Sequence, residues 1–225
     1  MQNAPAITPN DTLADLAARR AGASRAFARH HLDFCCHGQV SLAETCAKKG
    51  IDVDALIREI EQEERKDETF ERWDQRSLPE LTQHLVARFH EPHREELPRL
   101  LLMARRVEKG HGDKPLCPRG LADLLENLTA DLLQHMEKEE QILFPMVERG
   151  DGASAGPPIE VMQHEHEDAG AELAKIRQLT NDHTPPADAC GTWRALYLGL
   201  AEFERELMQH VHLENYVLFP GALKS

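Results

Sequence analysis

The sequence predicts an all-α protein in which a small helical N-terminal domain is followed by an up-down-up-down four-helix bundle. Long segments carry apolar residues every three or four positions, and short Gly- and Pro-containing stretches separate them. Residues 135–145 (HMEKEEQILFP) and 210–220 (HVHLENYVLFP) repeat one skeleton: His, three residues, Glu, four residues, Phe-Pro. Helices with short connections pack as antiparallel neighbours, and the repeat indicates two related helical hairpins.

The N-terminal part is expected to contain short, capped helices. Residues 1–10 have two prolines and no periodicity, which predicts a flexible arm. Residues 11–66 form the predicted small domain, and residues 67–76, at the end of a charge run, form a linker. Gly50 marks a helix end. The residues placed to cap helix N-termini are Asp11 or Thr12, Ser41, and Asp52 or Asp54.

Residues 77–225 are predicted to form the bundle. Its four helices are expected at about residues 78–111, 118–147, 158–180 and 186–219. A residue before proline is driven out of the α region, so each Phe-Pro pair is expected to end its helix. Pro92 and Pro98 are expected to bend or interrupt the first helix.

Composition limits the classes of function. The 225 residues carry a formal net charge of −13, which argues against nucleic acid or an anionic membrane as the main partner. There is no signal-like segment and no apolar run near 18 residues, so a soluble, cytoplasmic protein is expected. The five cysteines are loosely spaced and form neither a disulfide framework nor a zinc motif.

Six residues of the bundle are predicted metal ligands because five of them lie on the apolar stripes of their helices and the sixth, His90, lies at the edge of its stripe. A carboxylate on an apolar face must be paired or bound to a metal. Nitrogen and oxygen donors without thiolates suit a pair of transition-metal ions, with glutamates bridging and histidines terminal. Iron is the first choice of metal, with zinc or manganese as alternatives. The alternative without a metal is purely structural: a set of buried His–Glu pairs joined by hydrogen bonds. The six residues are His90, His135, Glu139, His166, His210 and Glu214.

The sequence leaves the roles of three neighbours of these residues open. His93 shares a helix face with Phe89 and His90, which makes it either a supporting partner of a ligand or a fifth imidazole. Glu91 and Glu165 each stand beside a predicted ligand in the sequence. They are candidates for hydrogen bonds to ligands or for proton relays.

The motifs that carry these residues resemble a known family. DFCC at residues 33–36, RFHEPHREELP, HGDKP, HMEKEEQILFP, HEHEDAG and HVHLENYVLFP resemble hemerythrin-like domains. They are more similar still to the di-iron iron–sulfur cluster repair proteins, the RIC family, over nearly the whole chain. This resemblance implies two non-haem iron ions in an oxo- and carboxylate-bridged centre, held by the same six residues.

The resemblance also implies a function. It is the repair of iron–sulfur clusters damaged by nitrosative or oxidative stress, with iron supplied from a labile di-iron centre and damaged iron–sulfur proteins as clients. NO and O2 would reach the metal. The alternatives are an enzyme that reduces or binds nitric oxide at the di-iron site, and a carrier or sensor of O2 or NO. Whether the protein is an enzyme stays open.

Cys35 and Cys36 are the candidate reactive residues outside the bundle. Adjacent cysteines cannot form an unstrained disulfide with each other, so as free thiols they could take up iron, bind a partner or form a redox link. The alternative is a purely structural role, in which both cysteines pack as small apolar side chains. His37 and Gly38 follow them, where the family usually has two glycines. A homodimer bridged by the cysteines is left open.

Overall fold

The computed structural model describes residues 5–66 and 70–224, and the regular elements among them are all helical. The all-α class and the bundle are therefore confirmed. Contacts divide the chain into two compact units, Met1–Ser77 with Met208–Gly221 and Leu78–Leu207 with Ala222–Ser225. Among the described residues, no helix combines the length and the apolar character needed to cross a membrane.

Four short helices build the N-terminal part of the first unit, and their caps follow the sequence. They are α1 (Leu13–Arg19), α2 (Ala23–Arg29), α3 (Leu42–Lys49) and α4 (Val53–Glu64), with a 3-10 turn η1 (Trp73–Gln75) after them. Thr12, Ser41 and Asp52 each accept a hydrogen bond from a backbone N–H in the first turn of the following helix. These bonds satisfy N–H groups that have no partner within the helix. Gly50 ends α3 in the left-handed conformation, as predicted.

An ion pair joins the end of α1 to the end of α4. Arg20, after α1, bonds Glu64 at the end of α4 through Nε at 2.9 Å and Nη2 at 2.6 Å. Arg20 also donates to the carbonyl of Pro5 at 3.0 Å, and Ile7 is buried. Residues 1–4 of the expected arm and residues 67–69 of the expected linker lie outside the described residues.

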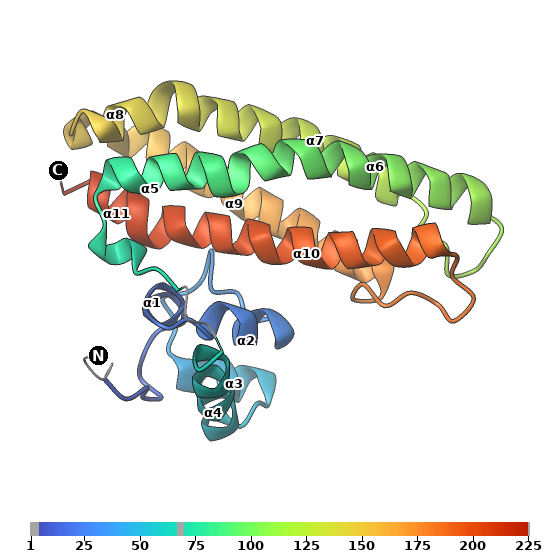
Figure 1. Ribbon diagram of the computed structural model, residues 1–225, viewed down its shortest axis with the longest axis horizontal. Coiled ribbons are helices and arrows are strands. Elements are labelled where there is room, and N and C mark those ends of the chain that lie inside the picture. The colour runs from blue at the N-terminus through green and yellow to red at the C-terminus, as the bar shows by residue number, and fades with distance from the viewer. Residues whose placement is uncertain (1–4, 67–69, 225) are drawn as a thin grey trace. The chain divides into compact units, whose positions relative to one another are not determined.

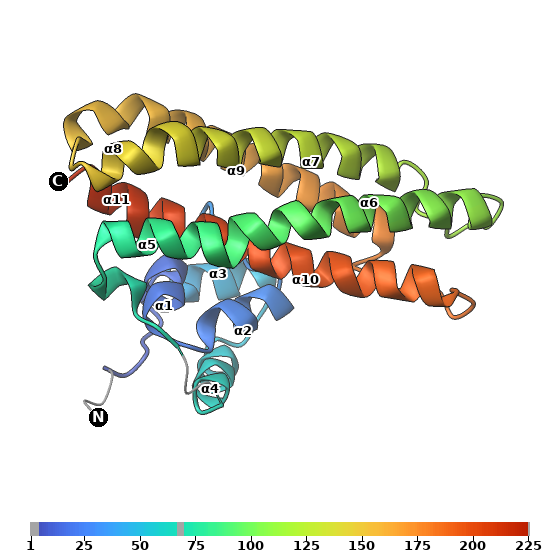
Figure 2. The same cartoon turned by 45° about the horizontal axis from the view of Figure 1, so that its top comes forward.

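Figures 1 and 2 show the bundle helices running side by side, each antiparallel to the next along the chain. The first consists of α5 (Leu78–Leu85) and α6 (Glu91–His111), and the second of α7 (Leu121–Lys138) and α8 (Phe144–Glu148). The third is α9 (Gly152–Thr180), which begins before the predicted start at Pro158. The fourth consists of α10 (Gly191–Leu213) and α11 (Phe219–Ala222).

Three π-helical segments correct the expectation that Phe-Pro ends a helix. They are η2 (Val86–His90), η3 (Glu139–Leu143) and η4 (Glu214–Leu218), and each continues directly into an α-helix. Phe144 is helical, with φ −62° and ψ −43°, although proline follows it. In each case a proline stands two residues after the segment. The wider i→i+5 turn changes the hydrogen-bond register just where proline has no N–H to donate, so the helix continues.

Candidate metal centre

The helices bring all six predicted ligands into the protein interior. His90 ends η2, while Glu139 and Glu214 begin η3 and η4. The other three lie on α7, α9 and α10. No residue of the six is more than 3% exposed. Three of the six thus sit at a π-helical boundary, a position that π-turns often take at functional sites.

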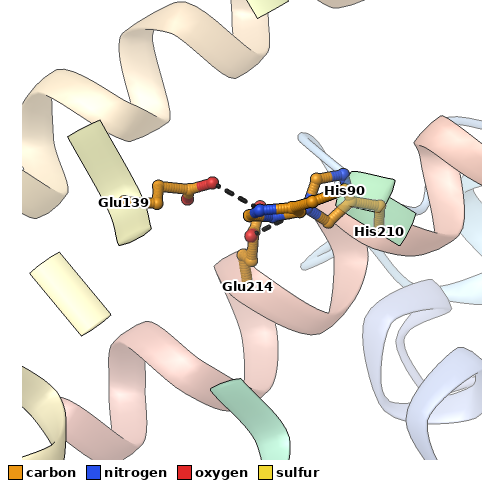
Figure 3. Close-up of side chains that lie close together, drawn as sticks. All are labelled: His90, Glu139, His210 and Glu214. Carbon is orange, nitrogen blue, oxygen red and sulfur yellow. Dashed lines mark hydrogen bonds and ion pairs between the residues drawn. The ribbon is translucent and has the colours of Figure 1, made fainter. Parts of the chain in front are cut away.

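The six residues form two groups, each with ligand atoms within 4.8 Å of one another. The first contains His90, Glu139, His210 and Glu214. Figure 3 shows the Glu139 side chain pointing toward the imidazoles of His90 and His210. The second group contains His135, Glu139, His166 and Glu214. Both glutamates belong to both groups. This arrangement fits two metal ions that share two carboxylates as ligands.

The histidines present the same ring nitrogen, Nε2, to these groups. Nε2 of His90 and Nε2 of His135 each lie 3.5 Å from Oε2 of Glu139. Nε2 of His210 lies 2.9 Å from Oε1 of Glu214. Nε2 of His166 lies 3.1 Å from Nε2 of His135. Two donors about 2.1 Å from one metal ion and at right angles to each other are about 3 Å apart, so this last spacing fits two ligands of one ion.

Glu139 gives an independent test of whether a metal fits. Both of its carboxylate oxygens are buried, and neither accepts a hydrogen bond from the described residues. A bare buried carboxylate costs several kcal/mol, whereas a bound cation compensates it. With histidine and carboxylate donors only, the set suits a transition metal. The residues present therefore fit a metal pair.

Two further carboxylates orient the histidines from outside. Nδ1 of His90 lies 2.7 Å from Oε1 of Glu140, which also accepts a bond from Arg94 at 2.7 Å. Nδ1 of His135 lies 2.9 Å from Oε2 of Glu165, which is paired with Lys138. A carboxylate at Nδ1 holds the proton there and leaves the Nε2 lone pair for a metal.

These contacts also set the charge of the two carboxylates. Burial alone would raise the pKa of Glu140, but hydrogen bonds from His90 and Arg94 outweigh it and lower the pKa below its usual value. Burial opposes a low pKa at Glu165 as well, and bonds from Lys138 and His135 lower it. Both side chains are therefore ionised at neutral pH, which favours the proton on Nδ1 of each histidine.

The structure shows which of the three neighbouring residues contact the predicted ligands. Glu165 contacts His135, whereas Glu91 is exposed. The partner of His90 is Glu140, which sequence reasoning missed. Helical periodicity gives only that Glu140 points about 100° away from Glu139, so no signal in the sequence identified His90 as its partner. His93 is buried against the rings of Phe89 and Phe203 and belongs to neither metal group.

The cysteine pair forms a third small group with Asp33. Sγ of Cys35 lies 3.6 Å from Sγ of Cys36 and 3.5 Å from Oδ1 of Asp33. Both cysteines are in the thiol form, Cys35 buried and Cys36 partly exposed. The hydrogen bond with Cys36, together with burial, raises the pKa of the Cys35 thiol well above its usual value.

His37 and the backbone stabilise the charge of Asp33 in this group. Nδ1 of His37 lies 2.6 Å from Oδ2 of Asp33, and the Cys36 N–H donates to Oδ1 at 2.9 Å. Burial opposes ionisation, but these bonds lower the pKa of Asp33. Asp33 is therefore a carboxylate beside the protonated Cys35 thiol at neutral pH. His37 faces the carboxylate and is not a member of the group of possible metal ligands.

The fold and the two groups define a hemerythrin-like, cation-binding bundle. Residues 81–222 match the hemerythrin HHE cation binding domain. Residues 9–64 match ScdA_N, a domain of unknown function (DUF542). These two matches assign the bundle and the N-terminal helical unit to separate families.

Similarity to curated proteins extends over both parts. The iron-sulfur cluster repair protein YtfE of Yersinia pseudotuberculosis serotype O:1b is 48% identical over 216 residues, which are 96% of this chain and 98% of that protein. The protein of the same name from Yersinia pestis (strain Pestoides F) is 47% identical over the same shares. The chain belongs to this family of iron-sulfur cluster repair proteins, and the resemblance seen in the motifs is confirmed.

Proposed function

We propose that this protein repairs iron–sulfur clusters damaged by nitrosative or oxidative stress by supplying iron from a non-haem di-iron centre. The observation that carries the proposal is the pair of buried His/Glu groups that share Glu139 and Glu214. The name of the relatives, iron-sulfur cluster repair protein, supports the same function. Damaged iron–sulfur proteins would be the clients.

Each iron ion would be held by two histidines and two bridging glutamates. His90 and His210 would serve one ion and His135 and His166 the other. Bound in this way, the iron pair would supply coordination positions open to NO or O2. Glu140 and Glu165 would keep Nδ1 of their histidines protonated and the rings oriented. Because each ion would have few protein ligands, the centre is expected to release iron as well as bind it.

Cys35 and Cys36 would receive iron on its way to a client. Two thiols and the Asp33 carboxylate lie within ligand distance of one another. Thiolates bind iron well, and metal binding displaces the thiol protons. Because the pKa of the Cys35 thiol is raised, transfer to this pair is expected to become faster as pH rises above neutral.

The first test measures metal in the anaerobically purified full-length protein. We expect two irons per chain, with an antiferromagnetically coupled Mössbauer spectrum that is lost in Glu139→Ala and in Glu214→Ala. Glu137→Ala, an exposed residue of the same segment, is the control and should keep both irons. One zinc ion or no metal, unchanged in the variants, would make the six residues structural and end the proposal.

The second test measures repair. The iron-loaded protein should restore the activity of a nitric-oxide-damaged [4Fe–4S] enzyme while losing iron itself. A Cys35→Ala/Cys36→Ala variant should keep its iron and fail to restore the client. Multiple turnovers of NO without loss of iron would instead identify a nitric oxide reductase, and reversible NO or O2 binding without turnover would identify a carrier.

A further inference from the structure

Three consecutive carbonyl groups of the cysteine segment are held by side chains of a single helical stretch. Residues 33–38, here called the thiol loop, contain the carbonyls of Phe34, Cys35 and Cys36. Their partners, here called the latch, are His212, Asn215 and Tyr216. The carbonyl of Phe34 lies 3.2 Å from Nδ1 of His212, that of Cys35 2.8 Å from Nδ2 of Asn215, and that of Cys36 2.8 Å from the hydroxyl of Tyr216.

Each latch residue donates a hydrogen bond to its carbonyl group, and this geometry holds the loop. Burial lowers the pKa of His212 to about 4, against a weaker opposing effect of its bond to Phe34, so the ring is neutral. Burial raises the pKa of Tyr216 to about 12. Its hydroxyl therefore stays protonated, donates to Cys36 and accepts the N–H of Gly38 at 2.7 Å.

The thiol loop also fits tightly against its own unit. A Cβ added to Gly38 would lie 2.4 Å from the carbonyl oxygen of Phe34 and 3.0 Å from Cβ of Ala14. The first distance is shorter than real Cβ contacts and the second is tight, so an alanine there would displace the loop. The ring of Phe34 packs against His212 at 5.6 Å between centroids. The loop is thus docked by packing as well as by hydrogen bonds.

The latch flanks Glu214 in the chain. Glu214 begins η4, with His212 two residues before it and Asn215 and Tyr216 directly after it. Any change in the conformation of this turn therefore moves the donors that hold the thiol loop. Because Glu214 belongs to both candidate metal groups, a bound metal pair would restrain the same turn.

The corresponding turn of the first repeat copy shows no such bonds to a loop carbonyl among the described residues. Glu137, Glu140 and Gln141 occupy the positions equivalent to the latch residues. Glu140 bonds His90, and Gln141 donates to Glu137 at 2.9 Å on the surface. The latch is therefore a property of the second copy alone, and the metal-binding skeleton does not require it.

We propose that the latch couples the metal centre to the thiol pair: metal bound at Glu214 makes the closed thiol loop more stable, and loss of metal lets the loop open more often and expose Cys35 and Cys36. His212, Asn215 and Tyr216 act as positioning residues in this scheme. The proposal rests on the proposed function, because it requires metal at Glu214. By linkage, opening of the loop weakens metal binding by the same factor as metal binding closes the loop.

The test follows alkylation of each cysteine by iodoacetamide, using mass spectrometry on the full-length protein with and without bound Fe(II) under anaerobic conditions. In the wild type, Fe(II) should slow alkylation of Cys36 about tenfold. Tyr216→Phe should raise the metal-free rate about tenfold and abolish the effect of Fe(II) while the iron content stays the same. Gln141→Ala, at the equivalent position of the first copy, is the matched control and should behave as the wild type does.

Gly38→Ala gives a second route to an open loop without any change in the helix that carries Glu214. It should raise alkylation of Cys36 as Tyr216→Phe does, with an unchanged circular dichroism spectrum. Wild-type rates in Tyr216→Phe would overturn the latch. Protection by Fe(II) that persists in Tyr216→Phe would mean that the thiols bind iron directly, and would overturn the coupling. Failure of the wild type to bind iron would overturn the proposed function, whereas the metal-free rates would still test the latch.

Discussion

The two copies of the repeat, residues 135–145 and 210–220, agree on their inner face and differ on their outer face. Both place a buried His and a buried Glu four residues apart, both begin a π-helical segment at the Glu, and both end in Leu-Phe-Pro. The outer positions hold Glu137, Lys138, Glu140 and Gln141 in the first copy and His212, Leu213, Asn215 and Tyr216 in the second.

The difference shows that one metal-binding skeleton supports two kinds of contact. In the first copy the outer side chains are charged or polar, and they serve the ligands His90 and His135 through Glu140 and the Lys138–Glu165 pair. In the second copy, His212 and Leu213 are buried and the thiol loop bonds to the latch. The inner face is constrained by helix packing around the polar groups, while the outer face is free to take either role.

The largest predicted effect is the same in both copies. Glu139→Ala and Glu214→Ala should each reduce iron from two per chain to less than one, because each glutamate belongs to both groups. Glu139→Ala should also stabilise the metal-free protein by about 2 kcal/mol, because it removes a buried carboxyl group whose two oxygens accept no hydrogen bond from the described residues. Metal analysis and urea unfolding measure the two effects. A metal-free Glu139→Ala that is less stable than the wild type would contradict this account.

The next prediction separates the copies. Glu140→Ala should weaken metal binding about 10- to 100-fold, because it removes the group that orients His90. Asn215→Ala, at the equivalent position, should change metal affinity much less and should instead raise alkylation of Cys36. Competition with a chelator gives the affinities. If the two variants lost affinity equally, the outer faces would not have diverged in role.

A pH dependence should distinguish the same two positions. Glu140 has a lowered pKa in the folded protein, so its stabilisation is present above its unfolded pKa, about 4.5, and is lost as pH falls through the lower folded value. The wild type should be more stable than Glu140→Gln by about 1–2 kcal/mol at pH 6, with the gap closing below pH 4.5. Asn215→Ala should show a gap independent of pH. Urea unfolding of the metal-free proteins across this range would reveal a constant gap for Glu140→Gln if the prediction is wrong.

The smallest effects are expected at the prolines. Pro145→Ala and Pro220→Ala should each change the free energy of unfolding by less than about 1 kcal/mol, because the hydrogen bond gained and the chain stiffness lost oppose each other. Only Pro220→Ala should also speed alkylation of Cys36, since η4 carries the latch. Equal alkylation rates in both variants would show that the π-turn and the thiol loop move independently.

Local patterns were enough to predict the helices, the caps and the inward position of the six candidate ligands. Helical periodicity places residues such as His135 and Glu139 on one face whatever the rest of the chain does, and an apolar stripe identifies that face as the buried one. The Thr12, Ser41 and Asp52 caps depend on only a few neighbouring residues. The repeat then linked the two halves of the bundle.

Tertiary structure alone decided what lies across from these faces. Proline predicted helix ends at Phe144 and Phe219, but the structure keeps the helices continuous through π-turns. The pairing of Glu140 with His90 spans 50 residues, and the bonds between the latch and the thiol loop span 178 to 180 residues. Periodicity reports which way a side chain points relative to its own helix. The partner it meets depends on the packing of distant segments, which no local pattern encodes.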